Sequence, residues 1–218
     1  MSNSIKIGLL SVVALLFSLK GYADSPLTST DFYVAYLDVS LVKAAADNPN
    51  VLTDEMMAYL YDDSNPLDVK MALINAVGWN VDERLSTFPD YMAYCTNHFP
   101  ADKGRSHPAG IVTWEDVYNN ASPDQWAVLV YLSAMADYSG LQTAGTLLEG
   151  AMQNSVNSES FMLPMALVWA QMKLYLGQWG YIYPSFQIMF GGAEVKDMRP
   201  EARRIINEYI DLYKEYAE

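Results

Sequence analysis

Cysteine and histidine are scarce in this chain of 218 residues, which contains one cysteine, Cys95, and two histidines, His98 and His107. A single cysteine excludes an intramolecular disulfide, so the fold must be held together by packing. A chain of this length can bury enough apolar surface to do so. We therefore expect Cys95 to be a small buried hydrophobic residue with an unreactive thiol.

Basic residues are also few, since 13 Lys and Arg stand against 26 Asp and Glu and give a net charge of −13. Such a chain repels phosphate backbones and anionic lipid headgroups, and no basic stripe offsets the repulsion locally. The charge balance therefore argues against a nucleic-acid partner. With 51% hydrophobic residues, the chain is too apolar to be disordered.

Residues 1–23 have the pattern of a bacterial-type secretory signal peptide. Lys6 lies in a short polar start, an apolar stretch follows, and Gly21 and Ala23 place small side chains before a cleavage site. The apolar stretch, 7–19, is shorter than the roughly 20 residues of a membrane-spanning helix. We therefore expect an exported protein, periplasmic or extracellular, with no integral membrane span after cleavage.

Apolar residues in the rest of the chain recur at helical spacing, whereas the alternation typical of strands is almost absent. The residues from Thr113 and from Ser122 each match the capping-box pattern of a helix start, which predicts well-capped helices. The segment 161–176 is apolar almost all round, which predicts a central helix covered on all sides. The expected helical segments are 30–46, 54–60, 66–77, 81–85, 90–97, a short helix from 114, 126–138, 141–152, 161–176 and a last helix from 200.

Two pairs of segments within the chain resemble each other. Residues 61–66 match 118–123, each ending one helix and opening the next, and residues 71–76 resemble 165–170. The two spacings differ, so the chain is not a regular array with one period. Well-capped helices packed through small residues produce such similarity, and so does a degenerate helical-hairpin repeat.

We predict that residues 24–218 form one all-α domain, an irregular array of about eight to ten helices arranged as antiparallel hairpins. This arrangement is loosely tetratricopeptide- or HEAT-like, although no diagnostic pattern of either class is present in full.

Few chemistries have candidate residues. Cys95, His98 and His107 could hold a metal or form a thiol–histidine pair, but a zinc site needs more ligands, and the bulky apolar neighbours of Cys95 predict burial. Phosphate-cradling glycine motifs and a Gly-x-Ser-x-Gly motif are absent. We therefore expect no metal and no cofactor, and no catalytic residue can be named.

The loop from Phe99 to Thr113 is the most promising place for a site. It concentrates positive charge on an otherwise acidic chain, and long loops on a rigid frame often carry function. A small anionic ligand could find donors here, although pairing of these charges with nearby carboxylates is the simpler interpretation. The candidate ligand-binding residues are Lys103, Arg105, His107 and Trp114.

The expected function is an exported binding or scaffold module whose grooves between helices recognise a protein, peptide or glycan. The alternative is a small secreted hydrolase acting on cell-wall or dietary polysaccharide, because sugars stack on aromatic rings and the chain holds 5 Trp and 16 Tyr. Most aromatic residues fall on apolar helix faces and are expected in the core, including Trp126, Tyr131, Trp169 and Tyr175.

Cleavage of the signal peptide after Ala23 is the first testable prediction. Protein recovered from the periplasm or medium should begin at Asp24, as measured by mass spectrometry, because small residues at positions −3 and −1 direct signal peptidase to this bond. Exported protein that retains Met1 would contradict it.

Overall fold

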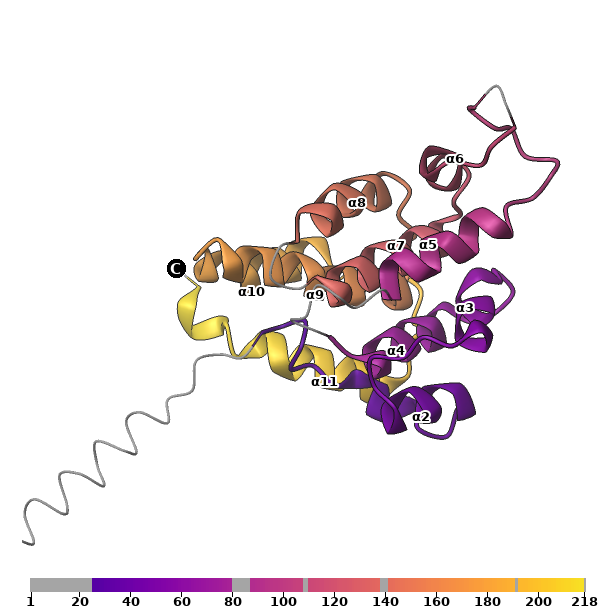
Figure 1. Ribbon diagram of the computed structural model, residues 1–218. Coiled ribbons are helices and arrows are strands. Elements are labelled where there is room, and N and C mark those ends of the chain that lie inside the picture. Colours follow the sequence, from indigo (N-terminus) through magenta and orange to yellow (C-terminus); the bar gives the residue numbers. More distant parts are fainter. Residues whose placement is uncertain (1–24, 80–86, 108–109, 138–140, 191, 218) are drawn as a thin grey trace, which may run out of the picture.

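Three mutually contacting helices, α4 (Leu67–Val77), α7 (Pro123–Ala136) and α9 (Glu159–Tyr175), form the centre of the molecule. The computed structural model describes residues 25–79, 87–107, 110–137, 141–190 and 192–217. Nearly every side chain of α4 is buried, as are most of those of α7 and α9. One continuous hydrophobic core therefore runs through the described chain, and Figure 1 shows how the helices around it are arranged.

Shorter helices surround these three. α8 packs on α7 and α9, α2 packs on α4, α5 packs on α7, and α10 packs on α9 and α11. The 3₁₀ helix η1 contacts both α4 and α11. The bounds of these elements are η1 Phe32–Tyr36, α2 Ser40–Asp47, α3 Asp54–Tyr61, α5 Thr87–Asn97, α6 Trp114–Asn119, α8 Gln142–Gln153, η2 Trp179–Tyr181, α10 Ile182–Met189, α11 Pro200–Asp211 and η3 Lys214–Tyr216.

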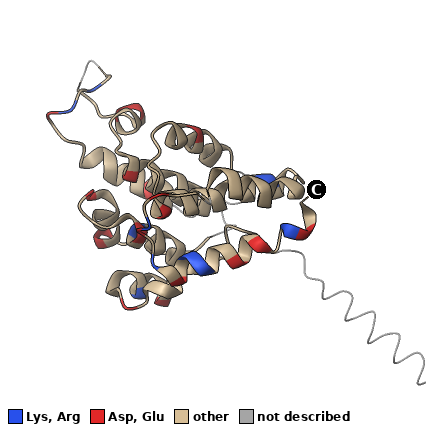
Figure 2. Ribbon diagram, turned by 180° about the vertical axis from the view of Figure 1, so that it is seen from behind, with Lys and Arg blue, Asp and Glu red and all other residues tan. Residues whose placement is uncertain are grey.

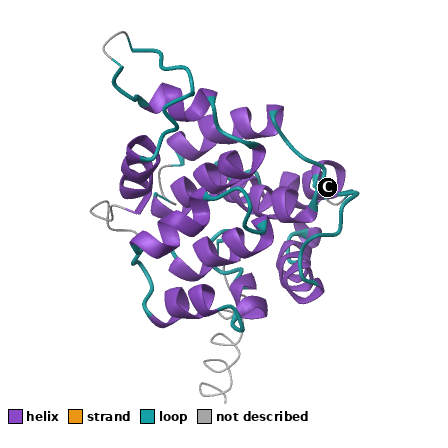
Figure 3. Ribbon diagram, turned by 90° about the vertical axis from the view of Figure 1, so that its right-hand side faces the viewer, coloured by secondary structure: helices purple, strands orange, loops and turns teal. Residues whose placement is uncertain are grey.

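The all-α prediction is confirmed for the described residues, which contain helices and loops and, as their one β interaction, an isolated bridge between Ser158 and Val195 (Figure 3). The tetratricopeptide- or HEAT-like stacking is not confirmed, because the outer helices surround a three-helix centre. The expected helix at 81–85 lies outside the described residues. None of the helices described is long and apolar enough to cross a membrane.

Local capping explains where several helices begin. Thr113 and Asp116 form a capping box at the start of α6, and Ser122 and Gln125 form another at the start of α7, both as predicted. These boxes satisfy backbone donors with side chains only three residues away, which is why the sequence alone reveals them. The Thr53 hydroxyl caps α3 without a reciprocal bond, by accepting from the Met56 N–H.

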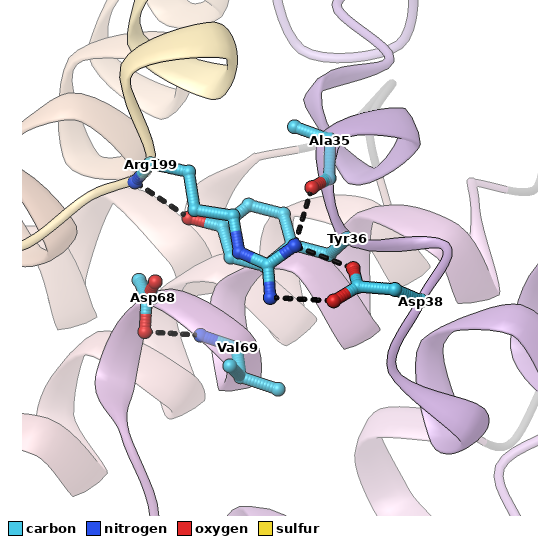
Figure 4. A network of polar contacts seen from close by, with 6 residues as sticks. All are labelled: Ala35, Tyr36, Asp38, Asp68, Val69 and Arg199. Carbon is cyan, nitrogen blue, oxygen red and sulfur yellow. Dashed lines mark hydrogen bonds and ion pairs between the residues drawn. The ribbon is translucent and has the colours of Figure 1, made fainter.

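The single helix expected over 30–46 is instead η1 followed by α2, so that prediction is wrong. Arg199, the N-cap residue of α11 and distant in sequence, explains the break (Figure 4). Its guanidinium donates to the Ala35 carbonyl oxygen at 2.8 Å and pairs with both carboxylate oxygens of Asp38. The Ala35 carbonyl oxygen therefore accepts from a side chain at a point where a continuing helix would use it for a backbone hydrogen bond.

Tyr36 anchors the same junction from the inside. Its ring is fully buried beneath the Arg199 guanidinium, whose central carbon lies 4.5 Å from the ring centroid, and its hydroxyl accepts from the Arg199 backbone N–H at 3.1 Å. The Asp68 carboxyl interacts with the same hydroxyl: burial raises the pKa of Asp68, and the hydroxyl partly offsets the rise. The junction thus joins η1, α4 and α11.

The outer face of α11 is charged and self-neutralising (Figure 2). Arg204 pairs with Glu201 and Glu208, and Lys214 pairs with Asp211 one turn further on. These pairs are solvent-exposed, so each contributes little to stability, and their main effect is to keep this face in water.

The prediction for α9 holds over most of its length, because residues 161–168 are all buried. It fails at the C-terminal end, where Tyr175 is 67% exposed instead of lying in the core. Of the other aromatic residues expected in the core, Tyr131 is fully buried, and Trp126 and Trp169 are half-buried. The last turn of α9 extends beyond the helices that cover it, so helical periodicity alone did not identify its exposure.

The Tyr36 hydroxyl should contribute measurably to stability. Tyr36→Phe is expected to lower the free energy of unfolding by about 1–3 kcal/mol, because it removes a buried hydrogen-bonding partner of Arg199 and Asp68. Urea unfolding followed by circular dichroism measures the change. Tyr33→Phe, in the same 3₁₀ turn, is the control and should change stability by less than about 0.5 kcal/mol. Equal losses in the two variants would contradict the role of the junction.

Candidate functional site

The loop between α5 and α6 carries the predicted ligand-binding residues and extends away from the helical body (Figure 1). Lys103, Arg105 and His107 are all exposed. Trp114, at the start of α6, is 47% exposed and packs edge-on against Phe88 at 6.2 Å between ring centroids. The loop assignment is confirmed over the described residues, and positions 108–109 lie outside them.

Two side chains brace this loop from within. The Arg105 guanidinium donates to the Gly110 carbonyl oxygen at 2.6 Å, so this cation is already engaged by the backbone. The Asp116 carboxylate accepts from the Ser106 N–H at 2.5 Å, and from the N–H and hydroxyl of Thr113 at 2.7 and 2.8 Å. Hydrogen bonds from the Thr113 and Ser106 backbone lower the pKa of Asp116 to about 2.

A cavity of about 390 Å³ lies beneath the loop, a size typical of small-ligand sites. It is bounded by the end of α3, by α5, by the first residues of the loop, by α6 and by the start of α7. Its lining residues are Tyr61, Asp62, Asp63, Cys95, Phe99, Pro100, Lys103, Val117, Asn120 and Gln125.

The charges lining the cavity are two carboxylates and one ammonium group. Asp62 accepts from the Ser64 N–H at 2.9 Å through one oxygen, and this backbone hydrogen bond lowers the pKa of Asp62. Asp63 accepts from the Ser122 hydroxyl at 2.9 Å through one oxygen. The Ser64 side chain also interacts with the Asp62 carboxylate, whereas within the described chain the second oxygen of Asp63 accepts no hydrogen bond. Lys103 is the one cationic side chain of the lining. The cavity therefore offers acceptors and a donor of opposite charge to one ligand.

The two similar turns noted in the sequence, 61–66 and 118–123, lie against each other and build one wall. Besides the bond from Ser122 to Asp63, the Gln125 side-chain amide donates to the Tyr61 carbonyl oxygen at 3.4 Å. Tyr61 and Asn120, which belong to the two turns, both line the cavity. The internal similarity thus marks the place where two helix–turn–helix segments meet.

Cys95 forms part of the cavity floor and is only 4% exposed, so its predicted burial is confirmed. Burial raises the pKa of its thiol to about 12, which disfavours a thiolate nucleophile. The His98 ring stacks on Tyr94 at 3.9 Å between centroids, and its Nδ1 lies 2.9 Å from the Tyr94 carbonyl oxygen. His98 is exposed, and it is held by Tyr94 instead of by the thiol.

The structure shows no cluster of three or more His, Cys, Asp or Glu in its described part that could hold a metal ion. A buried lysine lies near the carboxylates of this region. Lys70 of α4 has no exposed surface, and its ammonium group makes no hydrogen bond to a described residue. Burial lowers the pKa of Lys70, and the nearby charges of Asp124, Asp63 and Asp62 partly offset this.

Of the four predicted ligand-binding residues, the structure brings only Lys103 to the cavity. Arg105 braces the loop, and neither His107 nor Trp114 is part of the lining. Sequence reasoning missed Asp62 and Asp63, although the similarity of their turn to 118–123 was visible. That similarity pointed to their segment but carried no information on which helices meet there.

Acid titration provides a test of the loop brace. Since the folded-state pKa of Asp116 lies below the unfolded value of about 3.9, its stabilising contribution is present above that value and is lost as the pH falls toward about 2. The carboxyl carbon of Asp116 and the amide of Ser106 should titrate together with a midpoint near 2 in nuclear magnetic resonance (NMR) spectra. Thr113→Ala should raise this midpoint by removing one donor, and a wild-type midpoint near 4 would contradict the brace.

Comparison with known proteins found no family model that matches this chain, no similar curated protein and no similar solved structure.

Proposed function

We propose that this protein is an exported, non-catalytic binding module that holds a short peptide with free termini in the cavity beneath the 99–113 loop. The observation that carries the proposal is the lining itself, in which Lys103 and the carboxylates of Asp62 and Asp63 surround one cavity with aromatic walls. Export is supported by the signal-peptide pattern of residues 1–23, which lie outside the described structure. The site of action is then the periplasm or the exterior.

The acidic side of the cavity suits the amino terminus of a peptide. Asp63 keeps one oxygen without a hydrogen bond to the described chain, the Asp62 carboxylate lines the same cavity, and a protonated amine donates up to three hydrogen bonds. Tyr61 and Phe99 add aromatic rings, which attract cations through their faces. The net charge of −13 raises the local concentration of cationic groups around the whole molecule.

Lys103 suits the carboxylate of the same ligand. An ammonium group on a flexible stem can follow carboxylates at different distances, so it does not fix a single ligand length. Lys103 is also the one residue of the four proposed from the loop sequence that lines the cavity. Asn120 and Gln125 contribute amide groups to the lining between the charged groups.

Binding is favoured over hydrolysis by the state of the candidate catalytic groups. A thiol nucleophile needs a lowered pKa, whereas burial raises that of Cys95 to about 12. A general acid for glycoside hydrolysis needs a raised pKa, whereas that of Asp62 is lowered by the Ser64 backbone. Both groups therefore suit the lining of a binding site better than bond cleavage.

Titration with tripeptides, followed by NMR and isothermal calorimetry, tests the proposal. A panel with free termini and varied middle residues should shift the signals of Asn120 and Gln125. Amino-terminal acetylation should weaken binding through the loss of the cation, and carboxyl-terminal amidation through the loss of the anion. Lys103→Gln should reduce affinity about tenfold, as should the double change Asp62→Asn and Asp63→Asn, because each removes a charge-assisted contact.

Arg105→Gln is the matched control, because it removes a cation of the same loop that does not line the cavity. It should leave tripeptide affinity unchanged. A larger loss with Arg105→Gln than with Lys103→Gln would place the site on the exposed loop instead. Failure of every free-terminus tripeptide to bind, or equal binding of the blocked forms, would refute the proposal.

A further inference from the structure

A second cleft lies just beyond the C-terminal end of α9, where the turn after this helix meets the C-terminal segment. It has a volume of about 640 Å³ and is formed by the α9–η2 turn, η2, the start of α10 and η3. Its lining residues are Gly177, Gln178, Trp179, Gly180, Tyr181, Pro184 and Tyr216. None of them belongs to the cavity beneath the loop, so the cleft is a separate site.

Aromatic rings dominate this lining. Trp179 and Tyr216 pack edge to face with ring centroids 5.4 Å apart, which fixes the orientation of both rings. Tyr181 is 65% exposed, so most of its ring is available to a ligand. The cleft therefore offers one exposed ring, Tyr181, and two packed rings as aromatic surface for a partly apolar ligand.

The cleft is built rigidly from segments that are far apart in the sequence. A Cβ atom on Gly180 would lie 2.8 Å from the Tyr216 carbonyl oxygen, so only glycine permits this close approach of η2 to η3. Gln178 is held in place because its side-chain oxygen accepts from the Lys173 ammonium at 3.0 Å. Its Nε2 group donates to no residue in the described chain, which leaves two N–H donors for a ligand.

The lining contains no charged side chain, although the chain as a whole has a net charge of −13. An anionic ligand finds no cation in the lining, and a cationic ligand finds no carboxylate. The groups offered are aromatic faces, one side-chain amide and the backbone of two glycines. These groups match a neutral ligand with apolar faces and many hydroxyl groups.

We propose that this cleft binds a neutral oligosaccharide, with a sugar ring stacked on Tyr181 against Trp179 and Tyr216. The apolar C–H face of a pyranose ring contacts the aromatic faces, and its hydroxyl groups hydrogen-bond to Gln178 and to the exposed backbone. This site goes beyond the peptide cavity and does not depend on it.

A second copy of this chain is the main competing occupant, since Leu176 and Ile188 are exposed in neighbouring segments. Neither residue lines the cleft, and the lining offers fixed hydrogen-bond donors that an apolar interface would leave unpaired. The observations therefore favour the sugar, and self-association is measured as an outcome.

Binding of neutral hexasaccharides of glucose, xylose and mannose in their α- and β-linked forms tests the inference. At least one should bind the full mature chain and shift the Trp179 indole N–H signal in NMR spectra. Tyr181→Ala should weaken that binding about tenfold or more through loss of the stacking ring, and Tyr181→Phe should retain most of it.

Tyr175→Ala is the matched control, because Tyr175 is equally exposed, at 67%, but lies outside the lining. It should leave affinity unchanged. The inference is overturned if no hexasaccharide binds, or if Tyr175→Ala weakens binding as much as Tyr181→Ala. It is also overturned if Tyr181→Ala abolishes a concentration-dependent dimer, seen by sedimentation, while no sugar binds.

The double variant Asp62→Asn, Asp63→Asn should bind the sugar normally, which separates this site from the peptide cavity.

Discussion

The stacking of the Arg199 guanidinium on the buried ring of Tyr36 joins η1 to the start of α11, and the shape of the N-terminal region depends on it. The same guanidinium takes the Ala35 carbonyl and the Asp38 carboxylate, which ends η1 and turns the chain into α2. Because Tyr36 also reaches Asp68, the junction sets where α4 lies relative to the outer helices. The contacts of this junction thereby hold η1, α4 and α11 together.

Features with local causes were predictable from the sequence, and features with distant causes were not. The capping boxes at Thr113 and Ser122 and the start of α11 at Pro200 need only a few neighbouring residues, and the structure places them as expected. The break between η1 and α2 depends on a side chain more than 160 positions away, so periodicity extended one helix through it. Tyr175 was misjudged because periodicity reports a face of a helix and not how far the covering layer reaches.

The same distinction between local and distant causes applies to the residues of the candidate site. Lys103 was recognisable because a cation in a long loop stands out on an acidic chain. Asp62 and Asp63 are ordinary turn residues in the sequence, and they matter only because Ser122 and Gln125 pack against their turn. The aromatic cleft was hidden for the same reason, since Tyr216 meets Trp179 only in the folded chain. Juxtaposition, not residue type, defines both sites.

The 163 positions that separate Tyr36 from Arg199 also bear on the order of folding. During synthesis, the segment that covers the Tyr36 ring is made 163 positions after Tyr36 itself. Until then the η1 region lacks its partner, and contacts this distant in sequence form late because a long loop must close first. The N-terminal helices therefore cannot complete their packing as an independent unit, and a chain that terminates before Arg199 and α11 would expose the apolar surface of η1 that they normally cover.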